Sequence, residues 1–267
     1  GVMAAKGEYV GYVDGDDWVA DNWLAEVDKV IMESHPDIVE YNAFKSIDGK
    51  NVEMKTSHFR GFFGEKDIKE KIIPVMLCDR NQRFYTFGVL PAVWSKMIKA
   101  EILRDNLCSE DKITFGEDVA CIYNSILKCK SFYGIDIPLY YYRQNSQSMT
   151  KVYDTRRFER LEVLFAYLNE KLLQNNKHLD NQYDNYVLFC IFYASLNEAK
   201  NNTSFKEMGK KFENGLKRLD LENFVNVTTI KIGIPWNIML YLIKKKKYRM
   251  LMVLCRAIVK VKYTYKA

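Results

Sequence analysis

The sequence is poor in the residues that bind soft metals, and it contains no long apolar run. Its three histidines (His35, His58 and His178) lie far apart, and its six cysteines form no C-x-x-C pair, so we do not expect a zinc site. No signal peptide is visible, and no apolar stretch is long enough to span a bilayer. Reduced thiols in a cytosolic protein are therefore the expectation.

Acidic residues are missing from the end of the chain. Residues 223–267 contain ten Lys or Arg and no Asp or Glu, whereas residues 1–222 contain 30 basic and 34 acidic residues, a net charge of −4. The net charge of +6 for the whole chain thus combines a mildly acidic body with a strongly basic tail. We expect no nucleic-acid partner, because the body is acidic and large apolar residues separate the tail lysines.

The remaining composition is that of a globular protein with a sizeable core, with 48% hydrophobic and 28% charged residues among 267. Apolar periodicity predicts strands and helices in alternation up to about residue 150, and helices alone after it. The expected strands are 8–13, 37–44, an extended piece after the Asp48-Gly49 turn, and 132–142. The expected helices are 21–34 with Asp21 as N-cap, 66–77 shortened by Pro74, Pro91 to about residue 105, a stretch after Gly116, 155–175, 181–200, and 204–219 with a Ser204/Glu207 capping box. This order predicts an α/β domain over 1–150 and a helical extension over 151–267.

Asp14-Gly15-Asp16-Asp17 is the most informative motif, because it ends a short apolar strand in three carboxylates and a glycine. Mg²⁺ and Mn²⁺ prefer oxygen ligands and are commonly shared between one or two carboxylates and a substrate phosphate. Gly15 leaves room for a ligand to approach the backbone. Taken alone, the motif is equally compatible with a solvated turn whose acids cap the next helix.

Two further motifs contain candidate functional groups. Gly116-Glu117-Asp118 begins a helix, where acids are favoured by the helix dipole but where a partly buried carboxylate can also serve as a general base. Tyr140-Tyr141-Tyr142-Arg143, followed by Ser146, Ser148 and Thr150, combines an arginine with hydroxyl groups that suit phosphate or sugar contacts. Taken singly, the two motifs are better explained as a capped helix and as an edge strand with a polar turn.

The order of these motifs resembles the inverting family 2 glycosyltransferases of the GT-A fold, over about residues 3–150. The segment 5–10 leads into the aspartate motif, a Trp-Ser-Lys-Met segment follows at 94–97, and then come the Gly-Glu-Asp motif and a Tyr-Arg segment that ends in Ser-x-Thr. The resemblance implies a Rossmann-like catalytic domain with a helical extension. Family members begin with strands that bind the nucleotide, and nothing of that kind precedes Gly1. We therefore expect a catalytic domain that lacks its first strands, and a chain that alone binds nucleotide sugar weakly and turns over slowly or not at all.

The resemblance also implies roles for individual residues. Asp16 is expected to bind the metal, Mg²⁺ or Mn²⁺, and Asp14 to contact the nucleotide sugar, with Asp17 supporting either or capping the next helix. Asp118 corresponds to the catalytic base, and Glu117 orients it or touches the acceptor.

Four more residues are candidates for donor or acceptor binding. Arg143 and Ser148 are expected near the donor diphosphate or the acceptor. Trp94 and Lys96 belong to the Trp-Ser-Lys-Met segment, although taken alone Trp94 is more typical of a core and Lys96 of a surface.

The implied function is transfer of a sugar, with inversion, from a nucleotide-diphosphate donor to a glycan or lipid-linked acceptor in bacterial surface polysaccharide synthesis. Two alternatives remain open at this point. One is a metal-dependent phosphoryl-transfer enzyme, which would leave the Gly-Glu-Asp and Ser-x-Thr segments unexplained. The other is a catalytically inactive, membrane-associated fragment.

The tail, about 232–267, combines large apolar residues with lysines and with three aromatics, Trp236, Tyr241 and Tyr248. This pattern is typical of segments that bind an anionic membrane surface, and equally of a C-terminal helix packed on the body. The expected location is the cytoplasm, with peripheral attachment to the inner face of the cell membrane as one possibility.

Overall fold

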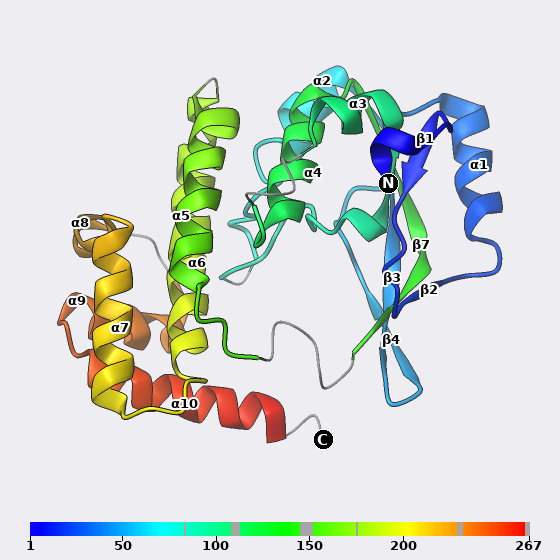
Figure 1. Ribbon diagram of the computed structural model, residues 1–267. Helices are drawn as coiled ribbons and strands as arrows, with labels where there is room; N and C mark the ends of the chain where they lie inside the picture. The colour runs from blue at the N-terminus through cyan, green and yellow to red at the C-terminus, as the bar shows by residue number, and fades with distance from the viewer. Residues whose placement is uncertain (83, 108–112, 145–151, 175, 229–231, 265–267) are drawn as a thin grey trace. The chain divides into compact units, whose positions relative to one another are not determined.

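The computed structural model describes residues 1–267 except 83, 108–112, 145–151, 175, 229–231 and 265–267. The chain forms two compact units. The first contains residues 1–79, 87–146 and 167–180, and the second contains residues 80–86, 147–166 and 181–267. Figure 1 shows a mixed sheet with flanking helices in the first unit and helices in the second.

The first unit is built on a seven-stranded sheet with the order β1-β6-β3-β7-β2, in which β4 also pairs with β3 and β5 with β7. Pairing is parallel between β3 and β7 and antiparallel elsewhere. The strands are β1 (Tyr9–Gly11), β2 (Trp18–Val19), β3 (Ile38–Ile47), β4 (Lys50–Met54), β5 (Gly61–Gly64), β6 (Lys96–Lys99) and β7 (Ser131–Arg143).

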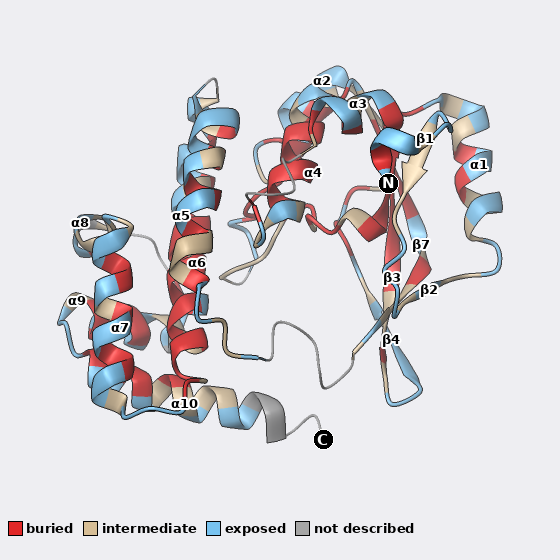
Figure 2. Cartoon of the chain, in the orientation of Figure 1, coloured by how far each residue is buried: buried red, intermediate tan, exposed pale blue. Residues whose placement is uncertain are grey.

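Helices cover both faces of this sheet (Figure 1). On one face, Val39 and Tyr41 of β3 pack in a core with Val27 and Val30 of α1 (Trp23–Ser34). On the other face lies α4 (Glu117–Lys128), whose Tyr123 hydroxyl donates a hydrogen bond to the carbonyl oxygen of Val89. Figure 2 shows that buried residues dominate both β3 and α4, as expected for elements at the centre of an α/β layer.

Short helices complete the first unit. They are η1 (Val2–Ala4), α2 (Glu65–Asp67), the π-helical turn η2 (Ile68–Ile72), η3 (Val93–Ser95), α3 (Ala100–Asp105), the π-helical turn η4 (Asn169–Leu173) and η5 (Lys177–Leu179). The turn between β3 and β4 uses Asp48 and Gly49, both with positive φ (48° and 77°), which confirms the turn expected at that dipeptide.

The second unit consists of helices around the buried helix α6. They are α5 (Arg157–Leu168, whose last two residues belong to the first unit), α6 (Asp180–Glu198), α7 (Phe205–Arg218), α8 (Glu222–Val227), α9 (Ile234–Lys244) and α10 (Tyr248–Thr264). The Ser204/Glu207 capping box at the start of α7 is present as expected. Gly215 allows α5 to approach α7 closely, because a Cβ atom there would lie 2.4 Å from Cγ of Phe158.

The segment 80–86 belongs to this helical unit through its aromatic side chains. Tyr85 stacks on Phe189 of α6 with ring centroids 4.5 Å apart, and Phe84 packs edge-on against Phe192 and Trp236, both at 5.8 Å. The apolar residues that the sequence shows around 84–90 are thus partly core residues of the helical unit.

Several expectations about local structure are wrong. Pro91 does not open a helix to residue 105; a 3₁₀ turn, strand β6 and the short α3 occupy this region, because 96–99 pairs with both β1 and β3. The N-cap position of α1 is held by Asn22 and not by Asp21. The short strands β2 and β5 were not anticipated, because two to four residues are too few to show a period.

Candidate active site

The acid motif forms a tight turn that is fastened to the end of β7. The backbone N–H of Asp17 donates to the carbonyl oxygen of Asp14 at 3.1 Å, which closes the turn. The Asp17 carboxylate accepts one hydrogen bond from the Tyr140 hydroxyl (2.8 Å) and another from the backbone N–H of Arg143 (2.7 Å). The same hydroxyl accepts from the backbone N–H of Asp14 at 3.0 Å. Asp17 therefore positions the turn, while its role in donor binding stays a prediction.

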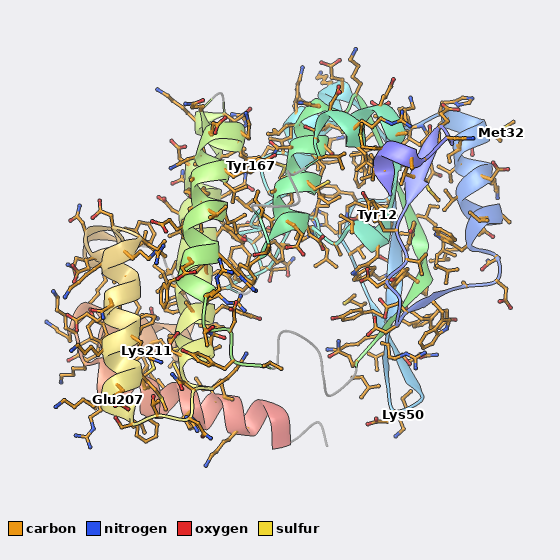
Figure 3. All side chains as sticks on the ribbon, in the orientation of Figure 1. Tyr12, Met32, Lys50, Tyr167, Glu207 and Lys211 are labelled. Atoms are coloured by element: carbon orange, nitrogen blue, oxygen red, sulfur yellow. The ribbon has the colours of Figure 1, made fainter. Side chains whose placement is uncertain are left out.

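The carboxylates of the turn are crowded. The pKa of Asp14 is raised, first by desolvation and then by the negative charges of Asp17 and Asp16. Desolvation also raises the pKa of Asp17, although the hydrogen bonds from Arg143 and Tyr140 oppose that rise. Asp14 and Asp16 are both exposed. Tyr12, labelled in Figure 3, lies just before them in the segment that follows β1.

Asp118 lies in the first turn of α4, after Gly116, which has a φ of 75° and so suits glycine. Its carboxylate accepts a hydrogen bond from the backbone N–H of Val93. Burial raises the pKa of Asp118 to about 7, and the negative charges of Glu117 and Asp14 contribute to the rise, while Lys96 opposes it. The structure thus brings Asp118 within electrostatic reach of the acid turn, and its pKa is suited to a general base near neutral pH. Glu117 is exposed beside it.

Trp94 is buried, and its ring contacts two tyrosines of β7. It stacks on Tyr140 with ring centroids 4.7 Å apart and on Tyr142 with centroids 5.5 Å apart. Its carbonyl oxygen accepts a hydrogen bond from the Tyr41 hydroxyl at 3.0 Å. The ring therefore supports Tyr140, which holds the acid turn, and a direct contact of Trp94 with donor or acceptor stays a prediction.

The environment of Lys96 does not fit the donor- or acceptor-binding role suggested by the sequence. Its side chain is fully buried, and Nζ lies 3.1 Å from Oε1 of the equally buried Glu40. It also donates to the carbonyl oxygen of Leu90 at 2.6 Å and to Ser95 Oγ at 2.9 Å. Because protein atoms enclose the ammonium group, we assign Lys96 to the interior of the site rather than to its binding surface.

Arg143 lies at the end of β7 with its guanidinium group 5.0 Å from the ring centroid of Trp18, a cation–π contact. Trp18 also stacks on Tyr141, with centroids 5.0 Å apart. Side chains alternate along a strand, so Arg143 and Tyr141 lie on the opposite face of β7 from Tyr140 and Tyr142. Ser146, Ser148 and Thr150 lie outside the described residues.

Sequence reasoning missed three parts of the site: the Tyr140 hydroxyl, the Trp18 ring and the backbone N–H of Val93. Tyr140 and Trp18 were visible as aromatics next to motif residues. The alternation of side chains along β7 could have shown that Tyr140 and Tyr142 lie on the same face. The Val93 contact gave no sequence signal, because a backbone N–H is present at nearly every residue.

The acid turn has the donor chemistry for a hard divalent cation, since its exposed groups are carboxylates. Among the described ranges, no group of three or more His, Cys, Asp or Glu side chains is arranged around a common metal position. A Mg²⁺ or Mn²⁺ ion at this turn would be held by one or two carboxylates and completed by a substrate diphosphate. The mutual crowding of Asp14, Asp16 and Asp17 is the observation that favours a cation here, since a positive charge would relieve it.

Comparison with known proteins points to one family. Residues 1–94 match the model for Glycosyl transferase family 2. The uncharacterized glycosyltransferase EpsJ of Bacillus subtilis is 25% identical over 153 residues, which are 57% of this chain and 42% of that protein. The putative glycosyltransferase EpsH of the same organism is 21% identical over 210 residues, 76% of this chain and 58% of that protein. The chain thus spans about half the length of these relatives.

Solved structures agree on the fold. The crystal structure of S. aureus TarS 1–349 superposes with a TM-score of 0.59 at 14% identity, covering 97% of this chain and 68% of that one. The same TarS fragment has also been solved in complex with UDP and with UDP-GlcNAc, with TM-scores of 0.59 and 0.57. The mixed sheet, its helical layers and the C-terminal helices confirm the expected GT-A-type α/β fold with a helical extension. The family match over residues 1–94 and the two Bacillus relatives support a family 2 glycosyltransferase.

Proposed function

We propose that this chain carries the metal-binding and acceptor-activating part of an inverting glycosyltransferase that uses a nucleotide-diphosphate sugar. The observation that carries the proposal is the place of the Asp118 carboxyl, which accepts a hydrogen bond from the Val93 N–H and whose pKa is raised to about 7 by burial and by the charges of Glu117 and of Asp14 in the acid turn. A base poised at neutral pH beside a cluster of exposed carboxylates is what the reaction needs. The TarS complexes with UDP and UDP-GlcNAc support a nucleotide-sugar donor.

In the proposed reaction, a hydroxyl oxygen of the acceptor attacks the anomeric carbon of the donor sugar. The bond between that carbon and the diphosphate oxygen breaks, the nucleoside diphosphate leaves, and the hydroxyl proton passes to the Asp118 carboxylate. Attack from the face opposite the leaving group inverts the anomeric configuration. A divalent ion held by Asp16, with Asp14 nearby, would neutralise negative charge on the departing diphosphate.

The acceptor proposed here is a glycan or a lipid-linked glycan, in the synthesis of a cell-envelope polysaccharide. The Bacillus relatives support the enzyme class, while the acceptor is inferred from the family resemblance. The phosphoryl-transfer alternative predicts a different product, because a phosphatase transfers the phosphoryl group to water and so releases inorganic phosphate and not a nucleoside diphosphate.

Replacing the proposed base tests this function. In an enzyme that joins this chain to the nucleotide-binding strands of the family, Asp118→Asn should lower acceptor-dependent release of nucleoside diphosphate at least about 100-fold, because proton removal by a positioned base contributes about that much, while donor binding stays unchanged. Asp105→Asn, at an exposed carboxyl at the end of α3, is the matched control and should keep the full rate. Equal rates in the two variants would refute the base assignment, and release of inorganic phosphate would favour phosphoryl transfer.

We also propose that the tail attaches the protein peripherally to an anionic membrane. Among the described residues, no helix is both long enough and apolar enough to cross a bilayer. The tail helices pack within the helical unit, with Met239 of α9 and Leu251 of α10 buried. Trp236 and Tyr248, expected as interfacial aromatics, instead contact Phe192 and Phe212 inside this unit.

An apolar stripe nevertheless stays on the surface of the tail. Ile234, Ile238 and Tyr241 recur at helical spacing on α9 and are 78%, 48% and 53% exposed. Met250 and Val253 of α10 are 56% and 48% exposed, and Figure 2 shows mostly exposed and intermediate residues along the visible side of that helix. Lys244 ends α9, and Lys245, Lys246 and Lys247 connect it to α10. Because no acidic residue occurs in 223–267, the charge is complementary to an anionic lipid surface.

Vesicle binding tests this attachment. The chain should sediment with phosphatidylglycerol vesicles and not with phosphatidylcholine vesicles, and added salt should weaken the binding because it screens the lysines. Ile238→Ser should reduce binding, whereas Met32→Ser, at a 70% exposed position on α1 (labelled in Figure 3), should not. Equal binding to both lipids, or equal loss in the two variants, would contradict membrane attachment through the tail.

A further inference from the structure

The buried pair formed by Lys96 and Glu40 has no role in the mechanism described so far. The two residues are cross-strand partners in β6 and β3, neither side chain has exposed surface, and Nζ lies 3.1 Å from Oε1. Removing two charges from water costs free energy, and well-packed neutral side chains often give equal or greater stability in such positions. The pair therefore calls for an explanation other than stability.

The ammonium group of Lys96 organises the backbone that precedes it. Besides Glu40, it donates to the carbonyl oxygens of Leu90 (2.6 Å) and Ala92 (3.3 Å) and to Ser95 Oγ (2.9 Å). The segment 90–96 is thereby folded around one cation. Glu40 is fixed from its other side, because its second oxygen accepts a hydrogen bond from Ser57 Oγ.

The Asp118 carboxylate and the acid turn (residues 14–17) both have partners that contact or belong to segment 90–96. The Val93 backbone N–H, within it, donates to the Asp118 carboxylate. The Trp94 ring, next along the segment, stacks on Tyr140, whose hydroxyl holds Asp17 and the backbone of Asp14. A cation that fixes residues 90–96 thus fixes the partners of the base and of the acid turn together.

We propose that Lys96, with Glu40 as its counter-ion, is a positioning residue for Asp118: it folds segment 90–96 so that the Val93 N–H meets the carboxylate, and it places a buried positive charge within reach of that carboxylate. This inference rests on the proposed role of Asp118 as the base. It accounts for a buried charge pair that stability alone does not explain.

The charges around the pair support an electrostatic part of this role. Asp118 faces Glu117 on its own helix, Asp14 in the acid turn and Lys96 from β6, and Lys96 alone of these three lowers its pKa. Lys96 in turn faces Glu40 and Asp118, and both oppose the lowering of its pKa by burial. The groups that face Glu40 further include the Tyr123 hydroxyl, which also faces Cys78.

The test removes both charges at once, because Lys96→Met alone would leave Glu40 buried without its counter-ion. In Glu40→Gln/Lys96→Met, carboxyl ¹³C NMR should show the pKa of Asp118 moving upward from about 7 by about 0.5 to 1 unit. The ionised fraction at pH 7 then falls from about half to between about a quarter and a tenth, so sugar transfer at pH 7 should drop about 2- to 5-fold and recover near pH 9.

A second pair on the same strand is the matched control. Lys99 Nζ lies 2.9 Å from Asp37 Oδ1, another ion pair between β6 and the start of β3. Asp37→Asn/Lys99→Met should leave the pKa of Asp118 unchanged, because the cation that lowers this pKa is Lys96 and not Lys99.

If the pair had a purely structural role, folded Glu40→Gln/Lys96→Met would keep the wild-type pKa of Asp118, and that result would overturn the proposal. An equal shift of the Asp118 pKa in the Asp37→Asn/Lys99→Met control would also overturn it. The NMR comparison does not require sugar transfer. If Asp118→Asn retained sugar transfer, the assignment of Asp118 as the base would be wrong. The NMR titration would still decide whether Lys96 controls the protonation state of Asp118.

Discussion

The hydroxyl of Tyr140 connects β7 to the acid turn, and removing it is the simplest test of the geometry of the site. Tyr140→Phe deletes a donor to the Asp17 carboxylate (2.8 Å) and an acceptor for the Asp14 backbone N–H (3.0 Å). The ring keeps its stacking on Trp94, so the buried apolar area stays almost the same. The loss is therefore a loss of hydrogen bonds, one of them to a charged group.

The magnitude follows from those two bonds. A hydrogen bond to a charged group contributes about 1.5–3 kcal/mol and a neutral one about 1 kcal/mol, and water can replace part of either in a partly buried turn. We therefore expect Tyr140→Phe to lower the free energy of unfolding by about 2 kcal/mol. Tyr142→Phe is the control, because Tyr142 stacks on the same tryptophan while its hydroxyl bonds to Gln144; it should cost less than about 1 kcal/mol.

Urea denaturation at several pH values provides the assay. The hydrogen bond from Tyr140 favours the ionised form of Asp17 and so lowers its pKa. Its contribution to stability is present above that pKa and is lost as the pH falls through it. The difference between wild type and Tyr140→Phe should therefore shrink in acid. Equal effects of the two Tyr→Phe substitutions, or a difference that does not change with pH, would refute the reasoning.

Three further predictions concern stability. The pKa of Asp118 is about 7 in the folded protein and 3.8 for the free group, so the free energy of unfolding of the wild type should fall as the pH rises between these values. Asp118→Asn should therefore raise the free energy of unfolding by about 2–4 kcal/mol at pH 8 and by almost nothing below pH 4, as measured by denaturant titration. Leu251→Ala, at a fully buried position of α10, should cost about 2–5 kcal/mol, whereas Val253→Ala, which is 48% exposed, should cost less than about 0.5. Ser204→Ala should remove the capping box of α7 and cost about 1 kcal/mol by the same measurement.

Local sequence patterns predicted the secondary structure correctly where an element has a repeating apolar pattern. The predicted strands at 8–13, 37–44 and 132–142 and the predicted helix after Gly116 all exist, because burial on one or two faces leaves a repeating apolar pattern. The prediction failed after Pro91, where the residues of β6 show no strand period of their own. Their conformation is fixed by pairing with β1 and β3, which are 80 or more and about 60 residues distant, so tertiary contact decided it.

In the candidate site, too, local motifs predicted some residues, whereas others depend on tertiary contacts. The motif order identified Asp14, Asp16, Asp17 and Asp118 as candidates, and the structure brings Asp118 within electrostatic reach of Asp14. Lys96 was expected to contact donor or acceptor because of the Trp-Ser-Lys-Met segment, and taken alone it was expected at the surface. Its burial depends on Glu40, 56 positions away and in register across two strands, which no local pattern reveals.

The most direct test of the site is a Mn²⁺ titration of the chain with ¹³C-labelled aspartate carboxyls in the presence of UDP. Paramagnetic broadening reports which carboxyls lie near the bound ion. We expect the resonances of Asp14, Asp16 and Asp118 to broaden at Mn²⁺ concentrations that leave Asp67 of α2 sharp, and we expect Asp16→Asn to abolish this selectivity. Uniform broadening of all aspartates, or selective broadening that survives in Asp16→Asn, would contradict a single site formed by the acid turn and Asp118.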